Sequence, residues 1–189
     1  MQPLGLVGRF DCPTSKSFLE ITKLGVPIGL SFFIEVSLFT CIMFLVAKLD
    51  GNTEDYVAAQ QVVISLTSLI YMIPQSLGSA ATVRVGFSLG REEYHRARYI
   101  SGVGISFAML ISLGTAIFLV LLRYPLAMMY TNDAAVIALA GSIILYAAAF
   151  QLVDAVQCVA GFCLRGYKVT TVPMLIHIVA FWGCGLIPG

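Results

Sequence analysis

Long apolar runs separated by short polar stretches form the dominant pattern of this chain. The first run, at 24–47, contains one charged residue, Glu35, and is bracketed by Lys23 and Lys48. A helix rises about 1.5 Å per residue, so a run of this length crosses the roughly 30 Å hydrocarbon core of a membrane. The pattern therefore predicts a membrane-spanning helix at about 22–48.

Four further apolar runs follow, with polar or charged segments such as DGNTED at 50–55 and RGYK at 165–168 between them. The segment at 123–133, with Pro125 and a TND turn, is expected to be a loop. The predicted fold class is an all-α membrane protein, with 1–189 as a single membrane domain. Its helices are expected at about 22–48, 56–83, 98–122, 134–164 and 169–188.

Prolines and small residues add detail to these helices. Pro27 lies in the first turn of the first predicted helix, where its missing N–H costs least. Pro74 is expected to kink the second helix, with neighbouring helices satisfying the freed carbonyl. The third predicted helix carries small residues suited to close helix packing, at Gly102, Ser106, Ser112 and Gly114.

Composition supports a membrane protein and argues against other classes. The 189 residues are 59% hydrophobic and 11% charged, whereas soluble domains are about 25% charged. A net charge of +1 argues against nucleic acid as a partner. The chain has no P-loop and no HExxH motif, which argues against an ATP-driven transporter and a metalloprotease. We therefore predict that the chain is not an enzyme.

Basic residues predict the orientation of the helices. Nine of the eleven Lys and Arg residues lie in the amino-terminal segment, in the loop between the second and third predicted helices, and in the turn at 165–168. The positive-inside rule then places the amino terminus in the cytoplasm. The chain stops just after Pro188, within its last apolar run, so we expect it to be part of a longer protein.

Two acidic residues, Glu35 and Asp154, lie inside predicted helices, whereas the other eight of the ten lie in loops or at helix ends. An ionised carboxylate near the membrane centre costs about 2.5–3.5 kcal/mol, so such residues are usually functional. We predict that the two acids approach each other between helices, share a Na⁺ ion or a proton, and titrate as a coupled pair. The alternative is a structural carboxylic acid that is protonated and hydrogen-bonded to a serine or glutamine.

Further candidates share the helix faces of the two acids, at a spacing of one turn. The candidates for lining the cavity or supporting the cation site are Ser31, Phe150, Gln151 and Gln157. Tyr71 could offer a hydroxyl or a ring face to a cation, although core packing is the more common use. His177 is predicted to be a neutral packing residue in preference to a proton relay.

Several segments, in uninterrupted order from about 21 to 189, resemble multidrug and toxic compound extrusion (MATE) transporters of the NorM type. They are KLGVPIGLSFFIEVSLF at 23–39, VAAQQVVISLTSLIYMIPQSLGSAATVRVGFSLG at 57–90, LLRYPLAMMYTND at 121–133 and YAAAFQLVDAVQCVAGFCLRGYK at 146–168. The FFIEV, PQSLGSAATVRVG and DAVQ–LRGYK elements fall at the spacing of that family.

The resemblance implies a fold of twelve helices in two six-helix lobes, of which this chain would supply helices seven to eleven. It implies a bacterial inner-membrane protein that exports cationic amphipathic drugs in exchange for Na⁺ or protons. In this family the carboxy-terminal lobe binds its cation through residues that match Glu35 and Asp154, and in some members through the tyrosine that matches Tyr71. The expected partners are cationic drugs, membrane lipid and the missing amino-terminal lobe.

Two positions depart from the family pattern. Phe150 stands where NorM members often have a tyrosine one turn before the aspartate, so a hydroxyl ligand is lost. Gln60 replaces the histidine that is usual in the second of these helices. The first departure weakens the assignment of Na⁺, and the coupling ion stays open between Na⁺ and H⁺.

The sequence thus predicts one lobe of a cation-coupled multidrug efflux antiporter that works by alternating access, with no cofactor beyond its coupling ion. Two alternatives are an inert or interaction-only truncated fragment and a related lipid-linked sugar flippase. A flippase would need a basic cavity for phosphates, and the predicted helix interiors carry no arginine or lysine.

Overall fold

The computed structural model describes residues 15–46 and 53–180, which form six helices and, within these ranges, no strand. In chain order they are α1 (Ser15–Val46), α2 (Thr53–Gly90), α3 (Tyr94–Leu121), α4 (Arg123–Met128), α5 (Ala134–Gly166) and α6 (Thr171–His177). The predicted all-α fold class is confirmed.

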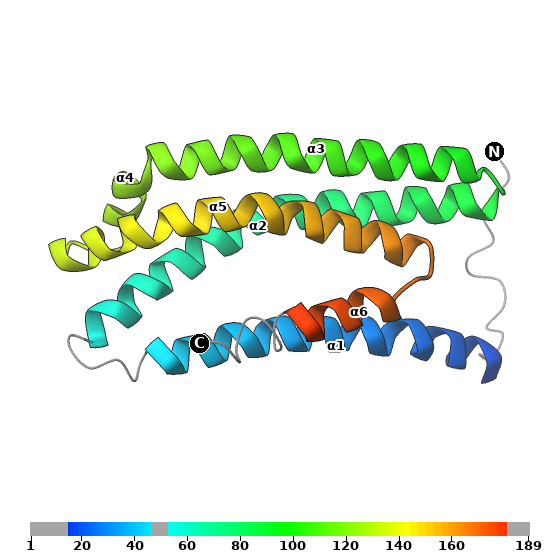
Figure 1. Ribbon diagram of the computed structural model, residues 1–189, viewed down its shortest axis with the longest axis horizontal. Coiled ribbons are helices and arrows are strands. Elements are labelled where there is room, and N and C mark those ends of the chain that lie inside the picture. The colour runs from blue at the N-terminus through cyan, green and yellow to red at the C-terminus, as the bar shows by residue number, and fades with distance from the viewer. Residues whose placement is uncertain (1–14, 47–52, 181–189) are drawn as a thin grey trace, which may run out of the picture.

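The helices form two groups, as Figure 1 shows. In the first, α2, α3 and α5 pack along one another, and the short α4 closes one end against α5. In the second, α6 lies beside α1, which touches the first group little. We call these the three-helix group and the α1–α6 pair. The start of α1, the α2–α3 connection and the α5–α6 connection all lie at the same end of the molecule.

Four helices are long and apolar enough to cross a membrane: Phe18–Leu45, Glu54–Gly90, Tyr94–Leu121 and Ala134–Gly166. They correspond to the first four predicted spans. For the fifth predicted span, at 169–188, the structure describes a shorter apolar helix, Thr171–Ala180. The rest of that span lies outside the described residues.

Several helix boundaries differ from the predictions; α2, for example, ends at Gly90 and not at about 83. Two of the differences involve a proline. Helix α1 begins at Ser15, so Pro27 lies well inside the helix and the prediction that it occupies the first turn is wrong. The segment predicted as a loop at 123–133 contains α4, because Leu126 N donates to Leu122 O at 2.9 Å and Ala127 is fully buried in the core. Pro125 is tolerated there because the first turn of a helix does not need its N–H.

Two connections show how the chain turns between helices. Between α2 and α3, Ser88 O accepts hydrogen bonds from the backbone N–H groups of Arg91 and Glu93, at 3.2 and 2.9 Å, and Glu92 takes a left-handed conformation with φ of 61°. At the start of α5, the Asp133 side chain accepts a bond of 2.8 Å from Ala135 N, which satisfies one of the free donors of the first turn. Short turns of this kind keep the helices antiparallel.

Small residues dominate the core between α2, α3 and α5. One cluster joins α2, α3, α4 and α5 around Ala59, Leu119, Ala127, Ala140 and Ile144, and a second joins Ala81, Ala108, Val159 and Cys163. Within a membrane, helices associate mainly through such close packing. Of the four small residues predicted to pack on the third helix, Ser112 is buried, whereas Gly102, Ser106 and Gly114 are exposed. The prediction is therefore wrong for those three, and Gly104, Ala108 and Ala116 form the packing face instead.

Helix α2 changes direction near its middle (Figure 1), in the region of the buried Pro74. A proline removes one backbone hydrogen bond and clashes with the carbonyl four residues earlier, which bends a helix. The carboxy-terminal half of α2 follows α3 and α5, while its amino-terminal half turns toward the end of α1.

Candidate functional site

One cavity collects acidic, aromatic and basic side chains from α1, α2, α5 and α6. It has about 380 Å³ of empty space, part of it open to the surroundings. We call it the acid cavity. Its lining residues are Phe32, Glu35, Tyr71, Asp154, Gln157, Cys158, Gly161, Phe162, Arg165 and His177. It lies at the boundary between the three-helix group and the α1–α6 pair.

Helical spacing explains how each element supplies its residues. On α1, Glu35 follows Phe32 by three positions and so shares its face. On α2, Tyr71 lies three positions before Pro74, next to the bend. On α5, the lining residues from Asp154 to Arg165 recur at intervals of three or four positions, which is one stripe along the helix. The bend of α2 and the stripe of α5 therefore face α1 across the cavity.

The structure brings four of the predicted site residues to this one cavity: Glu35, Tyr71, Asp154 and Gln157. The two acids are separated in the sequence by 118 residues, yet both line this cavity. This is the arrangement that a shared cation or proton requires.

The other three predicted residues lie elsewhere. Ser31 is buried and donates its hydroxyl to Pro27 O of its own helix at 2.9 Å, so it serves the backbone of α1. Phe150 is 52% exposed and lines neither cavity. Gln151 is buried but lines a different cavity. A helix face does not by itself reveal which neighbouring helix it meets, so the roles of these three residues in a substrate cavity or beside the cation site stay predictions.

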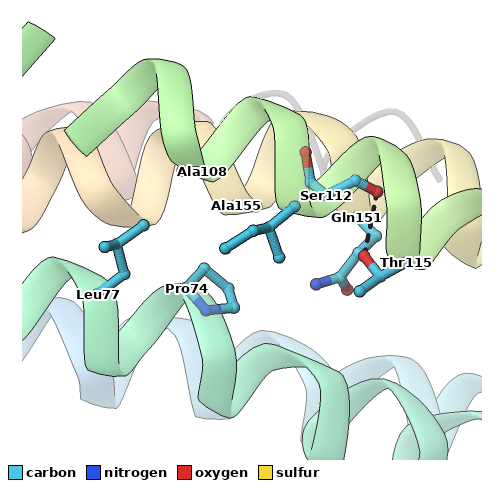
Figure 2. Close-up of a pocket in the computed structure, with 8 residues that line it drawn as sticks. Pro74, Leu77, Ala108, Ser112, Thr115, Gln151 and Ala155 are labelled. Atoms are coloured by element: carbon cyan, nitrogen blue, oxygen red, sulfur yellow. Dashed lines mark hydrogen bonds between the residues drawn. The ribbon is translucent and has the colours of Figure 1, made fainter. Parts of the chain in front are cut away.

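That second cavity, which we call the Pro74 cavity, lies between α2, α3 and α5 (Figure 2). Pro74 and Leu77 come from α2, Ser112 and Thr115 from α3, and Gln151 from α5. The Thr115 hydroxyl donates to Ser112 O at 3.0 Å. The empty space of the Pro74 cavity is about 210 Å³. The lining places polar groups beside the proline bend, where backbone carbonyls lose their usual partner.

Arg165 is the main member of the acid cavity that the sequence analysis missed. It was assigned to a basic turn, but α5 continues to Gly166, so Arg165 belongs to the helix and lines the cavity. An arginine in the last turn of α5 therefore reaches this cavity, although the predicted helix interiors carry none. The signal was present, since Arg165 lies eleven positions after Asp154 and three helical turns bring it to the same face.

Charges in the cavity are not paired with one another. Within the described residues, the ion pairs are Arg91–Glu93 and Arg96–Glu93, both at the α2–α3 connection. The Arg165 guanidinium instead lies over two rings, with its Cζ 4.8 Å from the Phe32 centroid and 4.4 Å from the Phe162 centroid. Two carboxylates and one guanidinium leave the cavity with an excess of acidic groups.

The donor set suits a hard monovalent cation or a proton. Carboxylate, phenol and amide oxygens from Glu35, Asp154, Tyr71 and Gln157 are the ligand type that hard cations prefer. Over the ranges 15–46 and 53–180, no cluster of three or more His, Cys, Asp and Glu residues could hold a metal ion.

One sequence pattern typical of hydrolases has a different role here. Residues 86–90 read GFSLG and match G-x-S-x-G, which in hydrolases places the serine on a sharp strand-to-helix turn. Here Ser88 is 2% exposed and lies in the last turns of α2. Its carbonyl caps the helix, so this match reflects a helix end.

Comparison with known proteins connects this arrangement to one family. Residues 27–189 match the MatE family. The "Probable multidrug resistance protein NorM" of Neisseria meningitidis serogroup B is 55% identical over 188 residues, which is 100% of this chain and 40% of that protein.

More distant relatives give the same result. "Multidrug resistance protein PmpM" of Pseudomonas aeruginosa is 41% identical over 96% of this chain and 37% of its own length, and "Multidrug resistance protein MdtK" of Proteus mirabilis is 39% identical over 96% and 39%. The chain thus spans about two fifths of the length of the curated relatives it matches. With four membrane-length helices and a family match over most of its residues, it is a multi-pass membrane protein that belongs to the MatE family.

Proposed function

We propose that this chain supplies the cation site of a cation-coupled multidrug efflux antiporter. The observation that carries the proposal is that Glu35, Asp154 and Tyr71, from three different helices, line one cavity. The relatives named as multidrug resistance proteins support export of drugs as the activity. The substrates are cationic amphipathic compounds, and the coupling ion is Na⁺ or a proton.

The proposed mechanism uses the position of the cavity between the two helix groups. A cation bound by Glu35 on α1 and Asp154 on α5 holds the α1–α6 pair against the three-helix group. Without the cation, two unneutralised carboxylates favour separation of the groups. Cation binding thus favours the outward-open arrangement and drug release, and cytoplasmic drug favours the reverse. The two ligands are coupled because each has a different affinity for the two arrangements.

We further propose that the chain lies in the bacterial inner membrane with its amino terminus in the cytoplasm. The described parts of the basic segments that predict this orientation lie at one end of the molecule, where α1 begins and where the α2–α3 and α5–α6 connections lie. This clustering at one membrane face supports the orientation. The proposed partners are membrane lipid and an amino-terminal lobe, which together with this lobe would enclose the drug path.

The test is efflux by a chimera in which residues 1–189 replace the aligned segment of the N. meningitidis relative. Vesicles are given either a Na⁺ gradient or a pH gradient, but not both. The chimera should export a fluorescent cationic dye under one of these two gradients, which identifies the coupling ion. Glu35→Gln and Asp154→Asn should each reduce efflux to the level of empty vesicles while leaving the helical content intact. Glu20→Gln, an exposed acid on the same α1, is the matched control and should export normally.

Normal efflux by the Glu35→Gln chimera would reject the proposed site. Residues 1–189 alone should be tested beside the chimera. If the chain is an inert fragment, neither the isolated chain nor the chimera should bind an ion or export the dye. Transport of a lipid-linked sugar in place of the dye would identify the flippase alternative.

A further inference from the structure

We propose that Arg165 is a tethered cation that competes with the coupling ion for Glu35 and Asp154, and so sets how tightly the ion is held. This inference rests on the proposed function, since it assigns a positioning role at the same cavity. Among the lysine and arginine residues of the described chain, Arg165 alone lines the acid cavity.

The guanidinium is held near the acids but away from ion-pair contact. Its Cζ lies 4.4–4.8 Å from the ring centroids of Phe32 and Phe162, a distance at which a cation is attracted to the ring face. We call these two rings the aromatic clamp. Phe32 precedes Glu35 by one helical turn, so the clamp keeps the charge beside Glu35 without neutralising it.

One side of the clamp is fixed by the three-helix group. The Phe162 ring lies against Gly78 of α2, where an added Cβ would come within 2.7 Å of Cδ2 and 2.9 Å of Cβ of Phe162. The carbonyl of Phe162 accepts a hydrogen bond of 2.7 Å from the Thr82 hydroxyl of α2. Phe162 therefore cannot shift easily, whereas Phe32 belongs to the loosely attached α1.

This difference gives Arg165 two positions. When a cation occupies the cavity, like-charge repulsion keeps the guanidinium in the aromatic clamp. When the cation leaves, the flexible arginine stem lets the guanidinium move toward Glu35, because a charged donor and a carboxylate attract strongly in a low-dielectric site. Arg165 thus neutralises part of the negative charge of the two acids when no ion is bound, and this helps the ion to leave.

The experiment measures ion binding by the purified 189-residue chain in lipid nanodiscs. Na⁺ is titrated by calorimetry at alkaline pH with choline as the balancing cation, and proton uptake is recorded in parallel. Arg165→Gln should bind Na⁺ or protons roughly tenfold to thirtyfold more tightly, because a positive charge lining the same cavity no longer repels the bound ion. Arg165→Lys should restore affinity close to that of the original chain.

A second variant tests the aromatic clamp through a change in ion affinity that is opposite in direction to that of Arg165→Gln. Phe32→Leu removes one ring and leaves the guanidinium freer to reach the acids, so it should weaken ion binding several-fold. General damage to the fold would not tighten binding in one variant and weaken it in the other. Arg123→Gln is the matched control, because Arg123 also lies over a ring, 4.6 Å from the Tyr124 centroid, but away from the acid cavity.

The outcomes separate this inference from the proposed function. Unchanged or weaker binding by Arg165→Gln, with a site that Glu35→Gln abolishes, overturns the tethered cation and leaves the cation site standing. If the original chain takes up neither Na⁺ nor protons at Glu35, both are overturned. Tighter binding by Arg123→Gln as well would show a general charge effect and would also reject the specific role of Arg165.

Discussion

The three-helix group and the α1–α6 pair are both built from apolar helices but are packed in different ways. Helix α5 buries ten residues, most of them small, whereas α6 buries none. In the most apolar window of each helix, 33% of residues are buried for α5 and 11% for α1. The first group is therefore a closely packed unit, and the second touches it little.

The acid cavity therefore lies where packing is weakest. Regions with few buried contacts open at a lower free-energy cost than well-packed cores. A site at such a boundary can change the relative position of the helix groups when its charge changes, whereas a site inside the three-helix group would have to disrupt a core. Three pairs of matched substitutions test whether the two groups differ in this way.

The largest effect is expected from a buried leucine. Leu119→Ala on α3 removes a side chain with 0% exposure and should lower the free energy of unfolding by about 2–4 kcal/mol, because it leaves a cavity. Leu45→Ala on α1, where the side chain is 57% exposed, should change it by less than about 0.5 kcal/mol. Denaturant unfolding in detergent micelles measures both. Equal losses would contradict the contrast between the groups.

A smaller effect is expected from filling a close contact. Gly78→Ala would push a methyl group into Phe162 and should destabilise the chain by about 1–3 kcal/mol through overpacking. Gly29→Ala on α1, where nothing lies within 4 Å of the added Cβ, should be neutral or stabilise by about 0.5–1 kcal/mol through helix propensity. Thermal unfolding of the two variants side by side gives the answer. A stabilising Gly78→Ala would show that α2 and α5 are not closely packed there.

The smallest effect concerns a hydroxyl. Thr82→Val removes the bond from α2 to Phe162 O on α5 and should cost about 0.5–1.5 kcal/mol. Thr40→Val on α1 removes a bond of 2.9 Å to Val36 O within the same helix, and should cost less because no contact between helices is lost. The same unfolding assay applies. Indistinguishable values for the two variants would mean that the α2–α5 bond adds nothing beyond local helix geometry.

The acid cavity shows where sequence reasoning succeeds and where it stops. Glu35 and Asp154 could be singled out because an acid inside an apolar run has few explanations, and the structure places both in one cavity. Ser31, Phe150 and Gln151 lie on the same helices as the two acids but do not line the acid cavity. Arg165 was missed because a charge near a helix end normally belongs to a polar turn.

Sequence by itself determined the all-α class, the four membrane-length helices and the two acids within them, since the length of an apolar run and the cost of a charge in hydrocarbon depend on local composition. Only the tertiary structure decided which faces meet. In a membrane an apolar residue can face lipid or another helix with similar ease, so hydrophobic periodicity does not choose the packing face. The bend of α2 and the face that α5 turns toward its neighbours decide the packing. As a result Tyr71 and Arg165 line the same cavity as the two acids, whereas Gln151 lines the Pro74 cavity.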